Sequence, residues 1–137
     1  MDNSIHNIDI FNASAALIFG ELYKNVPVPT TLNYQKLSLK ILEENNAASP
    51  STVLEVFINT VTWLKKSGFV WLDSEGELDV YGALLSPKGL EVLSIIPESS
   101  IVGEAIGITL SNSETVITNE EKAALVKIAI SAGNPLL

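Results

Sequence analysis

Residues 50–67 are the segment of this sequence with the clearest secondary-structure signals. Ser49 followed by Pro50 predicts a helix start, because serine caps helix N-termini and proline fits the first helical position. Gly68 followed by Phe69 predicts the end of the helix, since a glycine and then an apolar residue are typical of a Schellman ending. The apolar side chains between these signals recur with helical spacing: Leu54, Phe57, Ile58, Val61 and Leu64. We therefore expect a helix over residues 50–67 with one buried side.

Two helices are predicted before this segment. Asn12 is a good N-cap, and the apolar spacing after it predicts a helix over about residues 13–24. Asn33 caps a second helix of about residues 34–44. Residues 30–32 lie between them and are expected to be a short extended piece.

Two helices are also predicted in the second half of the chain. Ser86-Pro87 repeats the serine–proline start, and Pro97 limits this helix to about residues 87–96. Residues 118–121 have the sequence of a capping box, which predicts a last helix over about residues 119–132. The side chains expected to face inward are Leu90, Leu93 and Ile96 in the first of these and Ala124, Leu125, Ile128 and Ala132 in the second.

A β-hairpin is predicted after the helix of residues 50–67. Residues 69–72 and 78–85 are rich in apolar and aromatic side chains, and the polar segment 73–77 between them contains a glycine that favours a turn. Trp71 alternates with apolar neighbours and is expected on the outer face of its strand. Trp63 follows the apolar side of the preceding helix and is expected in the core.

The length and composition indicate a single globular domain. The chain has 137 residues, of which 47% are hydrophobic, and this is enough to form a real core. The absence of cysteine excludes disulfides and thiolate chemistry. The first residues lack the pattern of a signal peptide, and no apolar run approaches the roughly 20 residues of a membrane span. We expect a cytoplasmic protein with no membrane association.

The charge of the chain is strongly acidic and unevenly distributed. All eight basic residues are lysines, and 16 acidic residues bring the net charge to −8. Residues 1–69 carry five lysines and six acids, whereas residues 70–137 carry three lysines and ten acids, so their net charges are −1 and −7. Because Lys and Arg supply most of the affinity for phosphates, this balance disfavours nucleic acid as a partner.

The order of the predicted elements resembles that of winged-helix domains in bacterial regulators of the MarR or PadR type. The similarity is carried by residues 60–70, where a helix end runs through Gly-Phe-Val into a strand, and by residues 84–90, where the second strand meets the next helix. It covers about residues 11–96. The resemblance implies an α+β fold, a winged helix-turn-helix with a two-stranded wing and a helical C-terminal extension.

This resemblance divides the chain into three parts. Residues 1–10 are expected to be a flexible tail, residues 11–97 the winged-helix domain and residues 98–137 the extension. In many regulators of this type such an extension holds two chains together, so we expect a homodimer. Gly103 and Gly107 either allow close packing, within the domain or across a dimer, or break a helix at residues 98–111. The candidate dimer residues are Gly103, Gly107, Leu125 and Ile128.

The helix of residues 50–67 takes the place of the recognition helix in this resemblance. Its outward side is expected to show Ser51, Thr52, Glu55, Asn59, Thr62 and Lys66. Asparagine can read adenine, and Ser or Thr can contact phosphates or bases. The candidate contacts to a partner or to DNA are therefore Thr52, Glu55, Asn59, Thr62, Lys65 and Lys66.

The hairpin takes the place of the wing, but its charge departs from the pattern of DNA-binding wings. The wing candidates are Trp71, Asp73, Glu75, Glu77 and Asp79, and no lysine lies between residues 67 and 87. Four carboxylates would repel phosphates. Our leading hypothesis is therefore an interaction module that binds a protein partner through the acidic wing or the face of helix 50–67. The alternative is a DNA-binding transcriptional regulator that uses this helix face.

No catalytic residue, metal site or cofactor is predicted. The only histidine, His6, lies in the expected tail, and no phosphate-binding or dinucleotide-binding motif occurs. The acidic turn lacks the spacing of a calcium loop, because its glycine is the fourth residue and not the sixth. We expect a protein that is not an enzyme.

Overall fold

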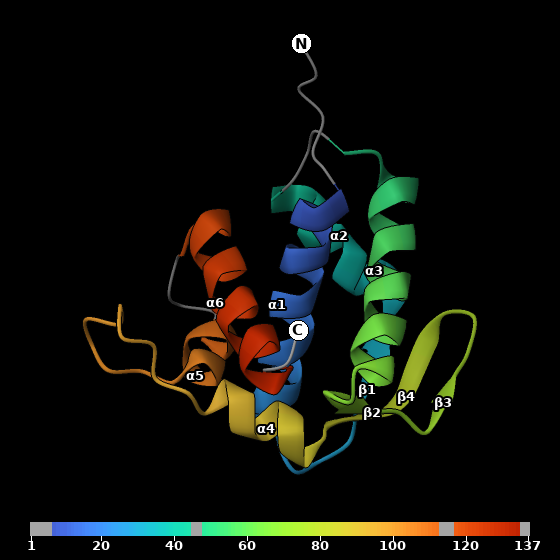
Figure 1. The fold of residues 1–137 in the computed structure, drawn as a ribbon. Coiled ribbons are helices and arrows are strands. Elements are labelled where there is room, and N and C mark those ends of the chain that lie inside the picture. Colours follow the sequence, from blue (N-terminus) through green and yellow to red (C-terminus); the bar gives the residue numbers. More distant parts are fainter. Residues whose placement is uncertain (1–6, 45–47, 113–116, 135–137) are drawn as a thin grey trace.

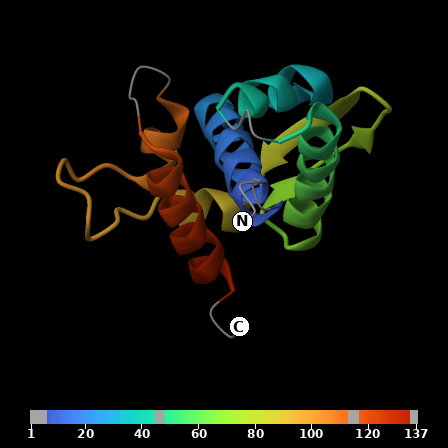
Figure 2. The ribbon, with the colours of Figure 1, turned by 90° about the horizontal axis from the view of Figure 1, so that it is seen from above.

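The computed structural model describes residues 7–44, 48–112 and 117–134, and these residues have a mixed α+β architecture (Figure 1). The central helix α1 (Asn7–Asn25) packs against α3 on one side and against α5 and α6 on the other, and α2 packs against α3 (Figure 2). The bounds of these four helices are Tyr34–Glu44 for α2, Pro50–Lys66 for α3, Ile106–Ser111 for α5 and Asn119–Gly133 for α6. In the described part of the chain, no helix is long and apolar enough to cross a membrane.

Helix α1 begins earlier than the sequence predicted. It starts at Asn7 and not at residue 13, so Asn12 is an interior residue and not an N-cap. Ile10 is completely buried, and the expected flexible tail is therefore wrong for residues 7–10. The physical reason is that the apolar side of the helix continues toward the N-terminus through Ile10, while Asp9 places a negative charge in the first turn, where the helix dipole favours it.

Helix α3 confirms both predicted ends. The Ser49 hydroxyl accepts a hydrogen bond from the backbone N–H of Thr52, and Pro50 occupies the first turn. At the other end Gly68 has a φ of 84°, and its N–H donates to Lys65 O at 3.0 Å. The N–H of Phe69 donates to Leu64 O at 3.0 Å, which completes a Schellman ending. This ending turns the chain from the helix directly into the sheet.

The antiparallel sheet consists of four short strands. The order is β1-β4-β2, and β3 also pairs with β4. The strands are β1 (Thr30–Asn33), β2 (Val70–Trp71), β3 (Ser74–Glu75) and β4 (Asp79–Leu85). The hairpin of β3 and β4 extends to one side of the helices (Figure 1). Val80, Ala83 and Leu85 are buried on the inner face of β4, and α1 and α4 both contact this strand.

The hairpin differs from the prediction in the position of its turn. Ser74 and Glu75, which were expected in the turn, form β3 and pair with Tyr81 and Val80. The first strand is interrupted between β2 and β3 opposite Gly82, which has a φ of 68°. A side chain on Gly82 would overlap the carboxylate of Asp73, so the glycine lets this carboxylate lie directly against the strand. Residues 76–78 form the turn, and the N–H of Gly76 donates to Asp79 O at 2.8 Å across it.

Helix α4 (Pro87–Leu93) is shorter than predicted. Its start at Ser86 is confirmed, because the Ser86 hydroxyl accepts a hydrogen bond from Gly89 N–H. The helix ends at Leu93 with Ser94 as its C-cap, and beyond it Ile95 O accepts a hydrogen bond from the N–H of Ile106 at 2.9 Å and not from a continued helix. Leu93 is buried as expected, but Leu90 is 38% and Ile96 is 58% exposed, so the inward prediction is wrong for these two residues.

Helix α6 begins with the predicted capping box between Thr118 and Glu121. Its buried residues are Val126 and Ala129, whereas three of the four predicted ones are exposed and Leu125 is half-buried. The sequence of α6 has apolar residues with helical spacing on more than one side, so their periodicity alone predicts the wrong side as buried. The predicted residues that are exposed are Ala124, Ile128 and Ala132.

Residues 98–111 are helical only at their end, in α5. Gly103 lies in the preceding loop with a φ of 72°, and nothing lies within 4 Å of the position that a Cβ would take there. Gly107 is buried in α5, and a side chain there would overlap the ring of Tyr23 on α1. Gly107 therefore has the predicted role of close packing, within the molecule. Gly103 lies outside the helix, where residues 98–105 are not helical.

Candidate functional site

The α3 outer face, which we define as Thr52, Glu55, Asn59, Thr62 and Lys66, is the first candidate surface. These side chains are exposed or half-buried, as the sequence predicted. Their polar groups bond to their own helix: Asn59 Nδ2 donates to Glu55 O at 2.9 Å, and the Thr62 hydroxyl donates to Ile58 O at 3.4 Å. Ser49 Oγ donates to the Thr52 hydroxyl at 2.8 Å. Glu55 and Lys66 cancel in charge, so the face is formally neutral.

The two lysines at the end of α3 differ in their surroundings. Lys65 Nζ lies 3.8 Å from a carboxylate oxygen of Glu75 on β3. Lys66 is exposed and makes no ion pair with any described residue. The fold therefore places one of the two predicted cationic contacts beside an acid of the hairpin.

Trp63 lies beside the α3 outer face and is 41% exposed, so the expectation that it lies in the core is wrong. Its ring makes an edge-to-face contact with Phe11 at a centroid distance of 5.2 Å and stacks on Phe69 at 6.5 Å. The earlier start of α1 explains this position, because the added turns of α1 bring Phe11 and Ile8 next to α3. A shallow hollow of about 380 Å³ results, lined by Asn7, Ile8, Phe11, Glu55, Val56, Asn59, Thr60 and Trp63.

The second candidate surface lies on the side of the sheet that faces away from the core. Trp71 is 56% exposed, which confirms its predicted outward position, and Tyr81 is 47% exposed. Val70 and Val80, their neighbours in sequence, are buried, as expected when successive side chains of a strand point to opposite faces. Leu84 pairs with Trp71 across the strands and is half-buried. The sheet thus presents two large aromatic rings to solvent.

Carboxylates accompany these rings. Asp79 accepts a hydrogen bond from Asn33 Nδ2 at 3.0 Å through Oδ1 and one from the Tyr81 hydroxyl at 3.4 Å through Oδ2. Asp73 lies against Gly82, where a side chain would displace it. Glu77 is exposed in the turn. We name Trp71, Asp79, Tyr81 and Leu84, together with the exposed Asp73 in the connection between β2 and β3, the outer sheet face.

Glu75 points elsewhere, toward the helices. It lies near Lys65 on α3 and near Tyr34 at the start of α2. Burial raises the pKa of the Tyr34 hydroxyl above its ordinary value of 10.0, and the negative charge of Glu75 raises it further. The backbone N–H of Tyr34 donates to Leu78 O at 3.0 Å, so the tip of the hairpin is tied to α2. The four acids predicted as one set are therefore split, with Glu75 facing the helices.

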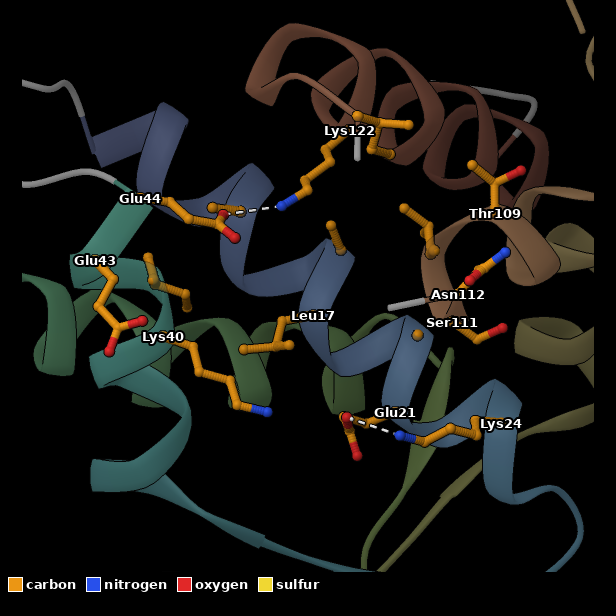
Figure 3. A pocket seen from close by; sticks show the side chains of 16 residues that line it. Leu17, Glu21, Lys24, Lys40, Glu43, Glu44, Thr109, Ser111, Asn112 and Lys122 are labelled. Atoms are coloured by element: carbon orange, nitrogen blue, oxygen red, sulfur yellow. Dashed lines mark hydrogen bonds and ion pairs between the residues drawn. The ribbon is translucent and has the colours of Figure 1, made fainter. Parts of the chain in front are cut away.

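A larger cavity of about 400 Å³ lies between α1, α2, α5 and α6 (Figure 3). Small residues of α1, among them Ala13, Ala16 and Gly20, line one wall. Two ion pairs stand at its edge, from Lys24 to Glu21 at 3.3 Å and from Lys122 to Glu44 at 2.8 Å. Three lysines and three glutamates line the cavity, so their charges cancel and the cavity favours neither an anion nor a cation.

The candidate dimer residues do not form one surface. Gly107 is buried against Tyr23 within the molecule, so its proposed place in a dimer contact is wrong. Leu125 is half-buried against the core, and Gly103 lies in an exposed loop. Ile128 is 36% exposed on the outward side of α6. The homodimer stays a prediction, and Ile128 is the apolar candidate at which light scattering of an Ile128→Asp variant can test it.

The part of the chain that the structure describes contains no group of three or more His, Cys, Asp or Glu side chains that could hold a metal ion. His6 lies outside the described residues. Two residues of the candidate surfaces were not predicted from the sequence. They are Phe11, which lines the hollow, and Asn33, which donates a hydrogen bond to Asp79. The apolar spacing of Ile10 with Leu17 signalled the longer α1, but no signal in the sequence pairs Asn33 with Asp79.

Comparison with known proteins identifies no relative of this chain. No family model, curated protein or solved structure matches the chain.

Proposed function

We propose that this chain is a non-enzymatic winged-helix module that binds a protein partner through its outer sheet face. The winged-helix interpretation is supported by the order α1, β1, α2, α3, β2 and β4, and by the pairing of β1 and β2 on either side of β4. In this interpretation α3 is the second helix of a helix-turn-helix, and the hairpin of β3 and β4 is the wing.

The observation that carries the proposal is the exposure of Trp71 on β2 and of Tyr81 on β4. Tryptophan and tyrosine are enriched among the residues that dominate protein interfaces, because they remove much apolar surface from water with few rotatable bonds. Both rings are about half exposed although the sheet has a buried side. Binding of a partner would bury this apolar surface and contribute favourable free energy.

The surroundings of α3 weigh against the alternative, a DNA-binding regulator. Duplex DNA needs several cationic contacts to its phosphates. On α3 the candidate cations are Lys65, which faces Glu75, and Lys66. The amide of Asn59, the predicted reader of adenine, already donates to the backbone of its own helix. The carboxylates of the wing would add repulsion.

A cross-linking experiment tests the proposal. A photoreactive phenylalanine derivative, which keeps an aromatic ring at the interface, replaces Trp71 in one variant of the full chain and Asn59 in another, and each is irradiated in cells of the source organism. We expect a protein adduct from position 71 and a much weaker adduct from position 59, because the outer sheet face is the proposed interface. A Tyr81→Ala change added to the first variant should reduce that adduct.

A DNA-binding assay tests the alternative function. The wild-type chain and the Lys65→Glu/Lys66→Glu variant are compared at low salt with a pool of random duplex DNA. We expect no shift of the DNA with either protein. A salt-dependent shift that this double change abolishes, together with no adduct at position 71, would replace the proposal with the DNA-binding alternative.

A further inference from the structure

The outer sheet face has a chemical character that selects its partner. Tyr81 lies on the same side of the sheet as the carboxylate of Asp79, which accepts a hydrogen bond from its hydroxyl, and the exposed Asp73 follows Trp71 in the connection between β2 and β3. No lysine follows Lys66 in the sequence until Lys88, so every charged side chain of β2, β3, β4 and their connections is negative. Aromatic faces attract cations, and carboxylates pair with them.

The Asp79 carboxylate is held in place by hydrogen bonds from Asn33 on β1 and from the hydroxyl of Tyr81. Asp73 is exposed beside Gly82. Glu75, by contrast, faces Lys65, which partly neutralises it. A fixed carboxylate loses less conformational entropy on binding than a mobile one, so Asp79 is suited to hold a cationic side chain, and Asp73 adds a second negative charge.

We propose that the outer sheet face binds a basic, arginine-containing segment of the partner protein. The guanidinium groups of this segment stack on Trp71 and Tyr81 and pair with Asp73 and Asp79. Arginine fits better than lysine, because its planar group can stack on a ring and donate two parallel hydrogen bonds to a carboxylate. A phosphate backbone is excluded by the same charges that attract arginine. This inference rests on the proposed function and adds the class of partner.

A peptide titration of the full chain tests the inference. The probe is a short fluorescent peptide of alternating arginine and serine, and its anisotropy is measured at low and at near-physiological salt. We expect saturable binding that weakens with salt. A matched lysine–serine peptide should bind more weakly, and a glutamate–serine peptide should not bind.

Variants locate the binding. Trp71→Ala and the double change Asp73→Asn/Asp79→Asn are each expected to lower the affinity by about tenfold or more. The matched controls are Trp63→Ala, which removes another exposed tryptophan, and Glu98→Gln/Glu120→Gln, which removes two exposed carboxylates elsewhere on the molecule. Both controls should bind like the wild-type chain. Circular dichroism verifies that each variant is folded.

Two outcomes would overturn the inference. One is the absence of binding by the arginine peptide at low salt, and the other is an equal loss of affinity in the control pair of glutamates, which would indicate attraction by net charge alone. The cross-linking at position 71 separates this failure from that of the proposed function. An adduct that depends on Tyr81 together with no peptide binding would leave the protein-binding proposal intact and contradict the basic partner.

Discussion

The two tryptophans of this chain have similar exposure but opposite surroundings. Trp63 is 41% exposed and packs against Phe11 and Phe69, beside a formally neutral helix face. Trp71 is 56% exposed on the two-residue strand β2, and every charged residue of β2, β3, β4 and their connections is acidic. The exposure of a tryptophan alone therefore does not indicate a binding surface. Trp71 makes no ring contact with any described residue, so its ring, unlike that of Trp63, is not held by aromatic packing.

The largest effect that can separate these residues is expected at Trp71. The Trp71→Ala change should weaken binding of the partner by about 2 kcal/mol, or roughly thirtyfold, because buried tryptophans at interfaces often cost this much on truncation. The stability of the free chain should change little, since the ring is exposed. Isothermal titration with the cross-linked partner, once purified, measures the first quantity and urea unfolding the second. A large loss of stability with unchanged binding would reverse the roles assigned to the two tryptophans.

The next largest effect should occur at Trp63 and concern stability. Trp63→Ala removes the contacts with Phe11 and Phe69, which we expect to lower the free energy of unfolding by about 1–2 kcal/mol. Partner binding should remain as in the wild-type chain. Urea unfolding of Trp63→Ala and of Trp63→Phe, which keeps an aromatic ring, checks the cause. A Trp63→Phe variant as unstable as Trp63→Ala would show that ring contacts do not account for the loss.

A smaller effect should occur where the hairpin meets α3. Lys65→Ala breaks the pair with Glu75, and both side chains are more than one-third exposed. Exposed ion pairs contribute at most about 1 kcal/mol, so the loss of stability should be below that value and smaller still at high salt. Lys66→Ala is the matched control and should leave stability unchanged. An equal effect of the two changes would mean that the ion pair does not anchor the hairpin.

The smallest effect should be a change in alkaline stability at Tyr34. Because its folded pKa is raised above 10.0, the folded state binds the phenol proton more tightly than the unfolded state does. The stability that this provides is present below pH 10 and is lost as the pH rises through the folded pKa. Tyr34→Phe should therefore lose less stability than the wild-type chain above about pH 10. Urea unfolding across this range measures the difference, and identical pH profiles would contradict it.

Local signals allowed several elements to be predicted well. The serine–proline starts at residues 49 and 86, the capping box at residue 118 and the glycine after α3 are determined by neighbours in sequence, and all four are present in the structure. Each depends on a hydrogen bond between residues only a few positions apart. This is why one sequence suffices to find them.

The remaining features depend on contacts between distant segments. The buried side of α6 is chosen by its packing on α1, since Val126 and Ile128 are equally suitable by sequence. The place of Trp63 depends on Phe11, which lies 52 positions earlier in the chain. On the outer sheet face, Trp71 was predicted from its alternation, but the inward position of Glu75 follows from its pairing with the buried Val80 on β4. Patterns in a single sequence do not indicate which distant segments come into contact.

NMR distinguishes contact through the outer sheet face from contact through α3. The isotope-labelled full chain is titrated separately with the arginine–serine peptide and with duplex DNA. We predict that the peptide shifts the backbone amides of residues 71–73 and 79–84 and that DNA shifts no amide of residues 51–66. Peptide shifts spread evenly over all acidic regions, or DNA shifts concentrated on α3, would show that the outer sheet face is not the interface.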